Sequence, residues 1–324
     1  MLEVYESNKM RTVIARTIDV LICSASFEDR SKSAAELVGQ RSVQRVLICE
    51  SQDHLPLVKG NGNWLRNRYQ ERAESVQVYS TNPLRSADSI SAHLVRARQA
   101  KPQYYLVDIT TFTRECLMIL LSLLRLRLKP TDTCHFIYNL AKDYSVGDPI
   151  EKKWLAKGIS EIRSVLAYPG EWRPSRKIHL ILLVGIEYER AVKFIDAFEP
   201  ATVSLGFCED AETVTLNKLG HNDIFYERLR NSYLNVNGSF QFPCLDPIHT
   251  RDVILQQIAA KPNYNVAVAP LNNKVSTVGA SLAALENADI QLCYAQASQY
   301  NFAKYSEPSE KFCLFEIPDF LHRT

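Results

Sequence analysis

The sequence predicts an α/β protein made of two tandem domains, each built on a mainly parallel β-sheet. Three observations lead to this prediction. Short apolar runs alternate with helical patterns along the chain, as they do in βαβ units. The length of 324 residues is long for one hydrophobic core and suits two. Finally, landmarks of the first half recur in the second half at a nearly constant spacing.

In the first half, strands are predicted where β-branched, aromatic and other apolar residues form short runs. These runs are Val20 to Ser24, Val43 to Cys49, Val76 to Tyr79, Tyr104 to Asp108 and His135 to Asn139. Helical patterns separate them, at Ser31 to Val38, within 51–75, at Ala87 to Ala100 and at Arg114 to Arg127. Residues 1–18 form a polar lead-in, and the first domain is expected to span residues 1–145.

The second half repeats the alternation after a segment of different composition. Residues 146–177 contain Trp and Pro residues, which predicts an ordered linker whose aromatic side chains pack against a domain. The second domain is expected at 178–302. Its predicted strands are Ile178 to Val184, Thr202 to Cys208, Ser239 to Phe242, Asn265 to Ala269 and Ile290 to Tyr294. Residues 303–324 are expected to form an irregular tail with a short final strand, Phe312 to Ile317.

The recurring landmarks predict an internal duplication. The motif Lys101-Pro102-Gln103-Tyr104 returns 160 residues later as Lys261-Pro262-Asn263-Tyr264. The acid–arginine pair Asp29-Arg30 returns at the same spacing as Glu189-Arg190, and Cys49-Glu50 returns 159 residues later as Cys208-Glu209. Because such landmarks keep one order and nearly one offset, we predict a duplicated Rossmann-like domain of roughly 150 residues, which makes the chain a pseudo-dimer.

Composition excludes some classes of function. A hydrophobic content of 46% and a charged content of 23% are ordinary for a soluble globular protein. The net charge of +2 argues against a broad nucleic-acid-binding surface. The richest apolar helix, Leu117 to Leu124, is too short to span a bilayer, and Met1 to Asn8 carries no secretory signal. We therefore expect a cytoplasmic protein that makes no membrane contact.

The cysteines and histidines predict neither a disulfide nor a metal site. The eight cysteines include no C-x-x-C pair, and most lie within apolar strands or helices, so buried reduced thiols are expected. The seven histidines share no metal-ligand spacing. The sequence contains no G-x-x-x-x-G-K-[ST] loop, and no G-x-G-x-x-G follows either first strand. We therefore expect no metal and no cofactor.

One stretch of the first half has the composition of an anion-binding turn. An apolar strand ends at Asp108, a threonine-rich turn follows, and a strongly apolar helix begins at Arg114. The amide groups and dipole of a helix N-terminus favour negative charge, so this place suits a phosphate group. The simpler interpretation is that Thr111 or Thr113 only caps the helix.

In parallel sheets, ligands bind beyond the carboxyl ends of the strands, where the strand order reverses. The loops after the first and fourth strands of each half are expected to meet there, and they supply hydroxyl, amide and charged groups. The candidate ligand-binding residues are Ser24, Ser26, Asp29, Arg30, Asp108, Thr110, Thr111, Thr113, Arg114, Glu189, Arg190, Asn272, Asn273 and Lys274. The alternative for the two acid–arginine pairs is a structural salt bridge at the first turn of a helix.

The motif from Asp108 to Arg114 resembles the strand-four motif of CARF (CRISPR-associated Rossmann fold) sensor domains. In that family an acid or amide is followed by Thr, two glycines, Thr and a basic residue. Asp108, Thr110, Thr113 and Arg114 match, while Thr111 and Phe112 stand where glycines are usual. The second half keeps only the cation, at Lys274.

The resemblance implies a sensor of cyclic or linear oligonucleotide messengers. Three functions stay open at this point. The first is a nucleotide sensor or accessory subunit of a prokaryotic defence or signalling system that acts on a separate effector chain. The second is an enzyme that cleaves a phosphodiester, in which Arg114 or Lys274 stabilises charge and Ser24 or Ser26 positions the ligand. The third is a non-catalytic interaction subunit with a degenerate pocket.

Overall fold

The computed structural model describes residues 3–144, 155–186, 188–209, 222–302 and 305–322. The chain divides into two compact units. Unit 1 comprises Met1–Asp143 together with Ser306–Thr324, and unit 2 comprises Tyr144–Tyr305. Unit 1 is therefore discontinuous in the sequence, because the end of the chain returns to it.

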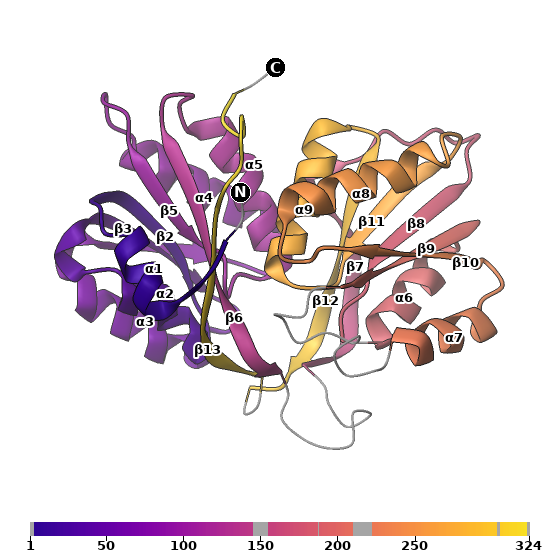
Figure 1. Cartoon of the computed structure of the whole chain (residues 1–324), viewed down its shortest axis with the longest axis horizontal. Coiled ribbons are helices and arrows are strands. Elements are labelled where there is room, and N and C mark those ends of the chain that lie inside the picture. Colours follow the sequence, from indigo (N-terminus) through magenta and orange to yellow (C-terminus); the bar gives the residue numbers. More distant parts are fainter. Residues whose placement is uncertain (1–2, 145–154, 187, 210–221, 303–304, 323–324) are drawn as a thin grey trace. The chain divides into compact units, whose positions relative to one another are not determined.

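Unit 1 contains a sheet that is mainly parallel (Figure 1). Its strands are β1 (Glu3–Glu6), β2 (Ile18–Ala25), β3 (Val43–Ser51), β4 (Ala73–Val78), β5 (Tyr104–Asp108), β6 (Thr133–Tyr144) and β13 (Ser306–Glu316). Its helices are α1 (Ser7–Val13), α2 (Ser33–Leu37), α3 (Leu55–Tyr69), α4 (Pro83–Ala97) and α5 (Arg114–Arg127). Short 3₁₀ turns cover Asp29–Lys32, Gln40–Ser42 and Gln70–Arg72. The strand order is β1-β13-β6-β5-β2-β3-β4, and β1 pairs with β13 in the antiparallel sense.

Unit 2 contains a sheet of the same kind. Its strands are β7 (Ala156–Pro169), β8 (Ile178–Leu183), β9 (Thr202–Cys208), β10 (Val236–Phe242), β11 (Asn265–Pro270) and β12 (Ile290–Tyr300). Its helices are α6 (Tyr188–Phe198), α7 (Asn222–Ser232), α8 (Pro247–Ala259) and α9 (Lys274–Glu286). The strand order is β10-β9-β8-β11-β12-β7. All neighbours pair in parallel except β7, which runs antiparallel to β12.

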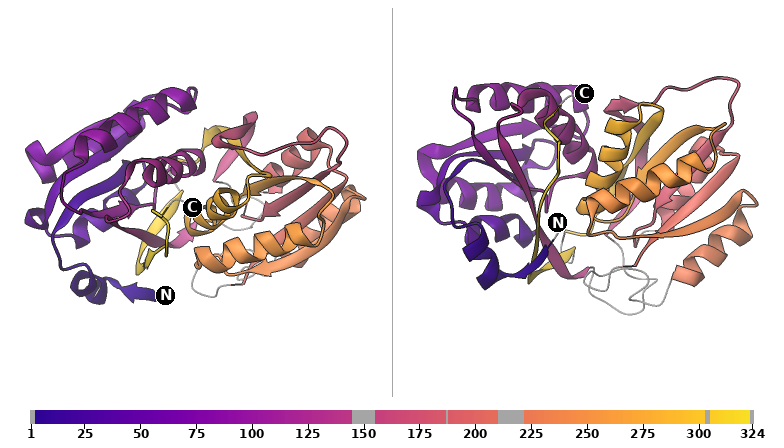
Figure 2. Two further views of the ribbon diagram at one scale, coloured as in Figure 1. Left: turned by 90° about the horizontal axis from the view of Figure 1, so that it is seen from above. Right: turned by 45° about the horizontal axis from the view of Figure 1, so that its top comes forward.

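These sheets confirm the predicted α/β class with mainly parallel strands. The central strands β5 and β11 are buried along their whole length, as expected when helices cover both faces of a parallel sheet (Figure 2). In unit 1, residues of α1, α2 and α3 pack with β2 and β3 into one core cluster. In unit 2, residues of α6 and α7 form the corresponding cluster with β8 and β9.

The five successive parallel strands follow one order in both sheets. Unit 1 has β4-β3-β2-β5-β6, and unit 2 has β10-β9-β8-β11-β12. In each case the first of the five lies in the centre, the next two extend to one side and the last two to the other. A tandem duplication produces this correspondence, and the duplication itself stays a prediction.

Two segments differ from their predicted roles. Residues 156–169 of the expected linker form β7, an edge strand of the second sheet, while residues 146–154 of that linker lie outside the described part of the chain. The predicted final strand, Phe312 to Ile317, is part of a longer strand, β13, which begins at Ser306 and lies between β6 and β1. The sequence pattern missed β7 and the first half of β13 because their polar residues are mostly exposed or half-buried, as is common in edge or partly covered strands.

Polar caps determine where the central helices begin. The side chains of Thr113 and Asn273 accept hydrogen bonds from the backbone N–H groups of Cys116 and Ser276, at 3.2 Å and 2.9 Å. Each cap lies directly before a helix that follows a central strand, so α5 and α9 both start close to the carboxyl edge of their sheet. This is the edge at which the candidate site is expected.

Candidate functional site

The carboxyl ends of β2 and β5 flank the point where the strand order of unit 1 reverses. Ser24 lies at the end of β2, and Thr111 lies in the turn that follows β5. The hydroxyl group of Thr111 donates a hydrogen bond of 2.9 Å to the backbone carbonyl oxygen of Ser24. This contact brings the two predicted loops together and holds the turn after β5 over the end of β2.

Asp108 and Thr110 shape that turn. The backbone N–H of Thr110 donates to the Asp108 carboxylate at 3.0 Å, and the Thr110 hydroxyl oxygen accepts from the backbone N–H of Asn139 on β6 at 3.0 Å. Asp108 is only 2% exposed. This burial raises the pKa of its carboxyl group to about 6, although the hydrogen bonds from Thr110 and the charge of Arg30 act in the opposite direction. Asp108 therefore titrates much closer to neutrality than an exposed aspartate.

The start of α5 combines a cap with two charged residues. Thr113 is exposed and caps the helix, so the capping interpretation holds for this residue, whereas Thr111 bridges to β2 instead. Arg114 is half-buried, and Glu115 in the same first turn is buried. Phe112, which stands where CARF sensors usually have glycine, is 1% exposed and contributes to the core.

Arg30 is built into the fold of unit 1. It is 2% exposed, and its guanidinium group donates to the Glu28 carboxylate at 2.8 Å and to the Asn139 carbonyl oxygen at 3.1 Å. It also donates to the Ser306 hydroxyl oxygen at 2.9 Å, and that hydroxyl in turn bonds to Glu28. Arg30 thus links the loop after β2 to β6 and β13, and it forms its ion pair with Glu28 and not with Asp29 of the predicted acid–arginine pair.

The other two candidates of this loop differ in exposure and in their partners. The Asp29 carboxylate is exposed and pairs with Lys32 at 2.8 Å on the surface. Ser26 is buried, and its hydroxyl oxygen accepts from the backbone N–H of Glu28 at 3.3 Å. Sequence reasoning missed Glu28, because it precedes the acid–arginine pair and has no matching acid at the required spacing in the other half.

Unit 2 repeats the bridge with different residues. The side-chain N–H of Asn272 donates to the Val184 carbonyl oxygen at 2.6 Å, which joins the turn after β11 to the end of β8. Asn273 caps α9, and its backbone N–H donates to the Asn272 side chain at 2.8 Å. At Gly185 a Cβ atom would lie 2.1 Å from the Leu271 carbonyl oxygen, so this close approach requires glycine. The structure therefore brings Asn272 and Asn273 together at this edge.

The charged candidates of unit 2 occupy separate helix starts. Glu189 and Arg190 lie in the first turn of α6, where Glu189 is exposed and Arg190 is buried. Lys274 is the first residue of α9 and is half-buried. Lys274 is the counterpart of Arg114 in both sequence spacing and helix position.

One prediction about the cysteines is wrong. Cys208 and Cys244 form a disulfide, while the other six cysteines, all within the described residues, are free thiols. Cys208 ends β9, and Cys244 follows the neighbouring strand β10, so their Cα atoms lie only 5.3 Å apart although they are separated by 36 residues in sequence. Sequence reasoning considered only short-range cysteine pairs. A cysteine just at or beyond the end of each of two successive strands is the signal that it overlooked.

A further buried charge lies at the end of β3. Glu50 is 4% exposed and forms an ion pair with Arg66 of α3. A Cβ atom at Gly62 of α3 would lie 2.2 Å from a carboxylate oxygen of Glu50, so the glycine leaves room for this side chain. Glu50 is thus a carboxylate of the same sheet edge whose charge is already balanced.

Within the described ranges, no group of three or more His, Cys, Asp or Glu side chains is arranged to hold a metal ion. Across the same residues, none of the helices combines the length and the apolar character needed to cross a membrane.

Comparisons with known proteins add little. No protein-family model and no curated protein matches the sequence. Among solved structures, the mitomycin 7-O-methyltransferase MmcR matches with 11% sequence identity and a TM-score of 0.24. The match covers 44% of this chain and 38% of that chain, well under half the length of the methyltransferase. A similarity this low supports no inference about function. The sheets and their switch points define the chain as a Rossmann-like α/β protein with two units.

Proposed function

We propose that the protein binds a nucleotide-type anion at the carboxyl edge of unit 1. In this proposal it serves as a sensor or accessory subunit of a prokaryotic defence or signalling system and acts on a separate effector chain. The observation that supports binding is the hydrogen bond from Thr111 to Ser24. It fixes the turn after β5 at the switch point, which is where ligands bind in open parallel sheets.

The start of α5 supplies the chemistry for an anion. A helix of 14 residues begins at this edge, and its dipole favours negative charge there. The exposed Thr113 and the half-buried Arg114 lie at the same helix end. A cation is disfavoured in the first turn of a helix unless negative charge is near, and a bound phosphate group provides it. Glu115 in the same turn is the competing explanation for the position of Arg114.

The choice of a sensor over an enzyme rests on how the charged residues are used. Arg30 is bonded to Glu28 and Asn139. This side chain is buried and holds a loop in place, which favours recognition over bond cleavage. The resemblance of the Asp108–Arg114 motif to CARF sensors supports the same choice and the class of ligand.

The first experiment identifies what the protein binds. Purified protein is denatured, and released nucleotides are identified by mass spectrometry. Binding of inorganic phosphate, ATP and linear and cyclic oligoadenylates is then measured by calorimetry. Arg114→Ala should weaken nucleotide binding roughly ten- to a hundred-fold, because a charge-assisted contact contributes about 1.5–3 kcal/mol. Lys274→Ala should weaken it less, since the motif of unit 2 keeps only the cation.

The matched control is Arg125→Ala, in the last turn of the same helix, which should bind nucleotide like the unaltered protein. Arg114→Ala should change the melting temperature little. If Arg114→Ala binds normally but melts several degrees lower, Arg114 is a structural partner of Glu115 or another group, and the proposed site is wrong.

A second candidate function is phosphodiester cleavage, and Asp108 is the observation that favours it. A carboxyl group with a pKa of about 6 can accept and return a proton near neutral pH. Product analysis in the binding experiment separates the two functions: cleaved oligonucleotide, lost in Asp108→Asn with binding retained, supports an enzyme. The absence of both binding and cleavage across the probes supports the third alternative, an interaction subunit with a degenerate pocket.

A further inference from the structure

The amino edge of the unit 1 sheet, where its parallel strands begin, carries an excess of positive charge. The chain reaches the starts of β2 to β6 through residues 14–19, 38–45, 70–74, 95–104 and 126–133. These five segments contain nine lysines and arginines and four acids. The net charge of +2 for the whole chain conceals this local excess, because acidic residues elsewhere balance it.

The amino edge of unit 2 has no such excess. Its corresponding segments are residues 174–179, 198–205, 233–237, 255–264 and 283–290, and they contain three lysines and arginines and three acids. Unit 1 has Arg127 and Lys129 before β6, whereas unit 2 has Glu286 and Asp289 before the corresponding strand, β12. The strand order that both units share therefore does not require the positive charge of unit 1.

The helix dipole accounts for a small part of this charge. Cations are favoured in the last turn of a helix, but of the nine only Arg96 and Arg127 lie in the last turn of an α-helix. In unit 2, α6, α8 and α9 lead to the amino edge of their sheet with no basic residue in the last turn. Most of the cations of unit 1 thus need another explanation.

Two of these cations are oriented by backbone carbonyl groups. Arg72 donates to the carbonyl oxygens of Gln40 and Val43, at 2.8 Å and 2.9 Å. Lys129 donates to the Ala100 carbonyl oxygen at 2.7 Å. A carbonyl oxygen fixes the position of a cationic side chain but has no net charge, so the positive charge of both residues is not compensated by these contacts.

Two further arginines also contact neutral groups. Arg127 donates to the Ser91 hydroxyl oxygen at 2.9 Å, which joins the end of α5 to α4. The guanidinium carbon of Arg16 lies 3.2 Å from the centre of the Tyr104 ring. These contacts hold the side chains at the edge of the sheet and leave their charge available to an anion.

The acids of this edge compensate little of the charge. Asp19 lies 3.8 Å from Lys101, and Glu74 forms an ion pair with Arg45 at 3.1 Å. Asp132 is buried and accepts hydrogen bonds from backbone N–H groups. Only one of the four acids is exposed, whereas six of the nine cations are. The exposed cations are Arg16, Arg41, Arg96, Arg98, Lys101 and Arg127.

The composition and length of this surface fit the phosphate backbone of a nucleic acid. Seven of the nine cations are arginines, whose planar guanidinium groups bind phosphate oxygens in pairs. Neighbouring strands lie about 4.8 Å apart, so cations at the starts of five strands form a row of about 19 Å. With one phosphate per about 3.4 Å of a nucleic-acid strand, such a row is long enough for several phosphates.

The same surface offers little to a protein partner. Among the residues of the five segments, Val95 and Leu126 are the exposed large apolar side chains. A protein–protein interface usually has an apolar centre that is depleted of charge, whereas nucleic-acid interfaces are more polar and much more positive. The amino edge of unit 1 resembles the second kind.

We propose that the amino edge of unit 1 binds a single nucleic-acid strand through its phosphates, without reading the base sequence. This surface lies at the edge of the sheet opposite to the start of α5, so it is a second site and does not depend on the proposed function. Phosphate contacts position a strand but carry no sequence information, and they release counterions. The affinity therefore falls steeply with salt and depends little on base composition.

The test uses the full chain and a fluorescent single-stranded DNA of about 20 nucleotides and mixed sequence. Binding is measured by fluorescence anisotropy between about 50 and 200 mM salt. With about four phosphates contacted, the logarithm of the binding constant should fall with the logarithm of the salt concentration with a slope of about −3. RNA of the same length, and DNA of different base composition, should bind with affinities within about threefold of that value.

The diagnostic variant is Arg96→Glu with Arg98→Glu, which reverses two exposed charges of the row. It should weaken binding at least about tenfold at low salt and make the slope less steep by about 1.4. The matched control is Arg173→Glu with Lys177→Glu, which makes the same change in net charge at the amino edge of unit 2. The control should bind the strand within about twofold of the unaltered protein.

Two single variants make the result independent of folding and of the nucleotide site. Arg41→Glu changes another segment of the same edge and should reduce the slope by about 0.7, so it repeats the test if the double variant does not fold. Arg114→Ala should bind the strand normally. A failure of the nucleotide site at α5 therefore leaves this measurement unaffected.

Three results would overturn the proposal. The first is that the unaltered protein does not bind the strand at low salt. The second is an equal loss of affinity in the unit 2 control, which would show attraction by net charge alone. The third is displacement of the DNA by polyglutamate at an equal concentration of charge, which would identify an acidic protein segment as the partner of this surface.

Discussion

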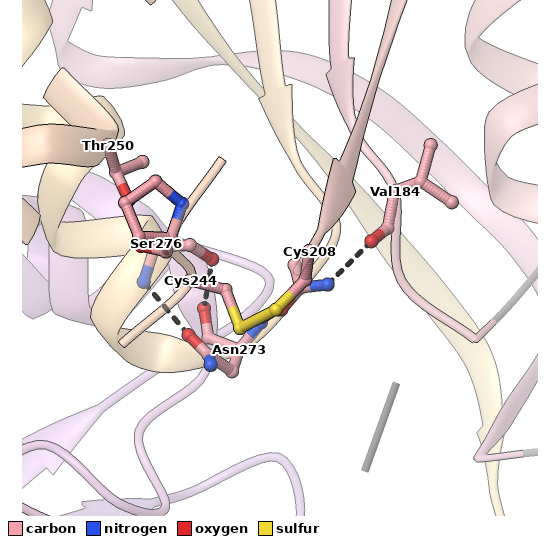
Figure 3. The surroundings of a disulfide bond; sticks show 8 residues. Val184, Cys208, Cys244, Thr250, Asn273 and Ser276 are labelled. Carbon is pink, nitrogen blue, oxygen red and sulfur yellow. Dashed lines mark hydrogen bonds between the residues drawn. A yellow bond between two sulfur atoms is a disulfide. The ribbon is translucent and has the colours of Figure 1, made fainter. Parts of the chain in front are cut away.

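The loops that enter α4 and α8 occupy matching places in the two units but are fastened in different ways. Both loops end in a capping residue followed by proline, Asn82-Pro83 in unit 1 and Asp246-Pro247 in unit 2. In unit 1 the loop is held by hydrogen bonds from Ser80 and Thr81 to the Asp53 carboxylate, at 2.8 Å and 2.9 Å for the two hydroxyl groups. In unit 2 the Cys208–Cys244 disulfide holds the loop that enters α8 (Figure 3).

A second difference concerns buried charge. At the carboxyl edge of unit 1, the ion pair of Arg30 with Glu28 is buried, Glu50 is a buried carboxylate paired with the partly exposed Arg66, and Asp108 is also buried. At the switch point of unit 2, β11 ends at Pro270, and the turn that follows, Leu271 to Asn273, has no ionisable side chain. The two units therefore differ in the charge at the end of the central strand, although unit 2 also buries a cation at this edge, Arg190 in the first turn of α6.

The largest expected effect tests the buried charge of unit 1. Arg30→Ala leaves the Glu28 carboxylate buried without its partner, and breaking a buried pair in this way costs about 3–5 kcal/mol of unfolding free energy. Urea unfolding followed by circular dichroism measures the loss. Asp29→Ala is the control, because Asp29 forms an exposed pair that contributes at most about 1 kcal/mol. Similar values for the two variants would show that the edge of unit 1 does not depend on its buried charge.

The second prediction concerns the covalent link of unit 2. Replacing both Cys208 and Cys244 by serine should lower the unfolding free energy by about 2–4 kcal/mol, because the unfolded chain regains the freedom of a closed loop of about 36 residues. The same urea experiment, run with and without a thiol reductant, measures the effect. Reductant should destabilise the unaltered protein and leave the double variant unchanged. A double variant as stable as the unaltered protein would show that the non-covalent contacts of this loop suffice.

The third prediction concerns the pH dependence of the unfolding free energy, to which Asp108 of unit 1 should contribute. The pKa of Asp108 is raised from 3.8 to about 6 in the folded state, so the native protein keeps this proton over a range in which the unfolded chain has lost it. The associated stability is complete below about pH 4 and is lost as the pH rises through about 6. The loss is on the order of 2–3 kcal/mol. Asp108→Asn should therefore reduce the difference in unfolding free energy between pH 4 and pH 7 by this amount.

A companion variant is Asn272→Asp, which introduces a carboxyl group into the corresponding turn of unit 2 and also removes the hydrogen bond from Asn272 to Val184. Its effect on the pH dependence of the unfolding free energy measures how much the turn of unit 2 raises the pKa of a carboxyl group. An Asp108→Asn protein with the same pH dependence as the unaltered protein would contradict the raised pKa.

The smallest expected effect concerns the hydrogen-bonded loop of unit 1. Partial burial alone would raise the pKa of Asp53, but the hydrogen bonds from Ser80 and Thr81 together lower it below its ordinary value of 3.8. Its contribution to stability is present above pH 3.8 and is lost as the pH falls through the lower folded-state value. Because Asp53 is exposed, Asp53→Ala should cost about 1 kcal/mol or less at pH 7. Comparing the melting temperatures of Asp53→Ala and of the cysteine double variant shows whether the hydrogen bonds to Asp53 or the disulfide stabilises its loop more.

The sequence predicted the elements whose stability is local or depends on an apolar pattern. The central strand of unit 1 and the helix that follows it are predictable because Tyr104 to Asp108 and Leu117 to Leu124 are apolar runs, and Thr113 is a recognisable cap. The meeting of the loops at the switch point was also foreseen, and the contact between Thr111 and Ser24 agrees with it. Whether these residues bind a ligand stays a prediction.

The features that sequence reasoning missed depend on partners far away in the chain. Strand β13 has polar residues in its first half, and its place in the sheet becomes apparent only when Asn139 donates to the carbonyl oxygens of Ser309 and Lys311. The disulfide joins residues that become neighbours only after β9 and β10 pair. The lead-in at residues 1–18 was also underestimated, since β1 and α1 form there and Met10 is fully buried. Hydrophobic periodicity does not report such long-range contacts.

The place of β13 in the first sheet has a consequence for how the protein is made. This strand is synthesised after all of unit 2, yet Arg30 and Asn139 both bond to it, through Ser306 and through Ser309. While the chain is being translated, the side of β6 that β13 will cover stays open until all of unit 2 has left the ribosome. The sheet of unit 1 therefore cannot be completed before unit 2 has been synthesised, and a chain that stops before residue 306 leaves unit 1 with a buried cation and a buried amide short of their partners.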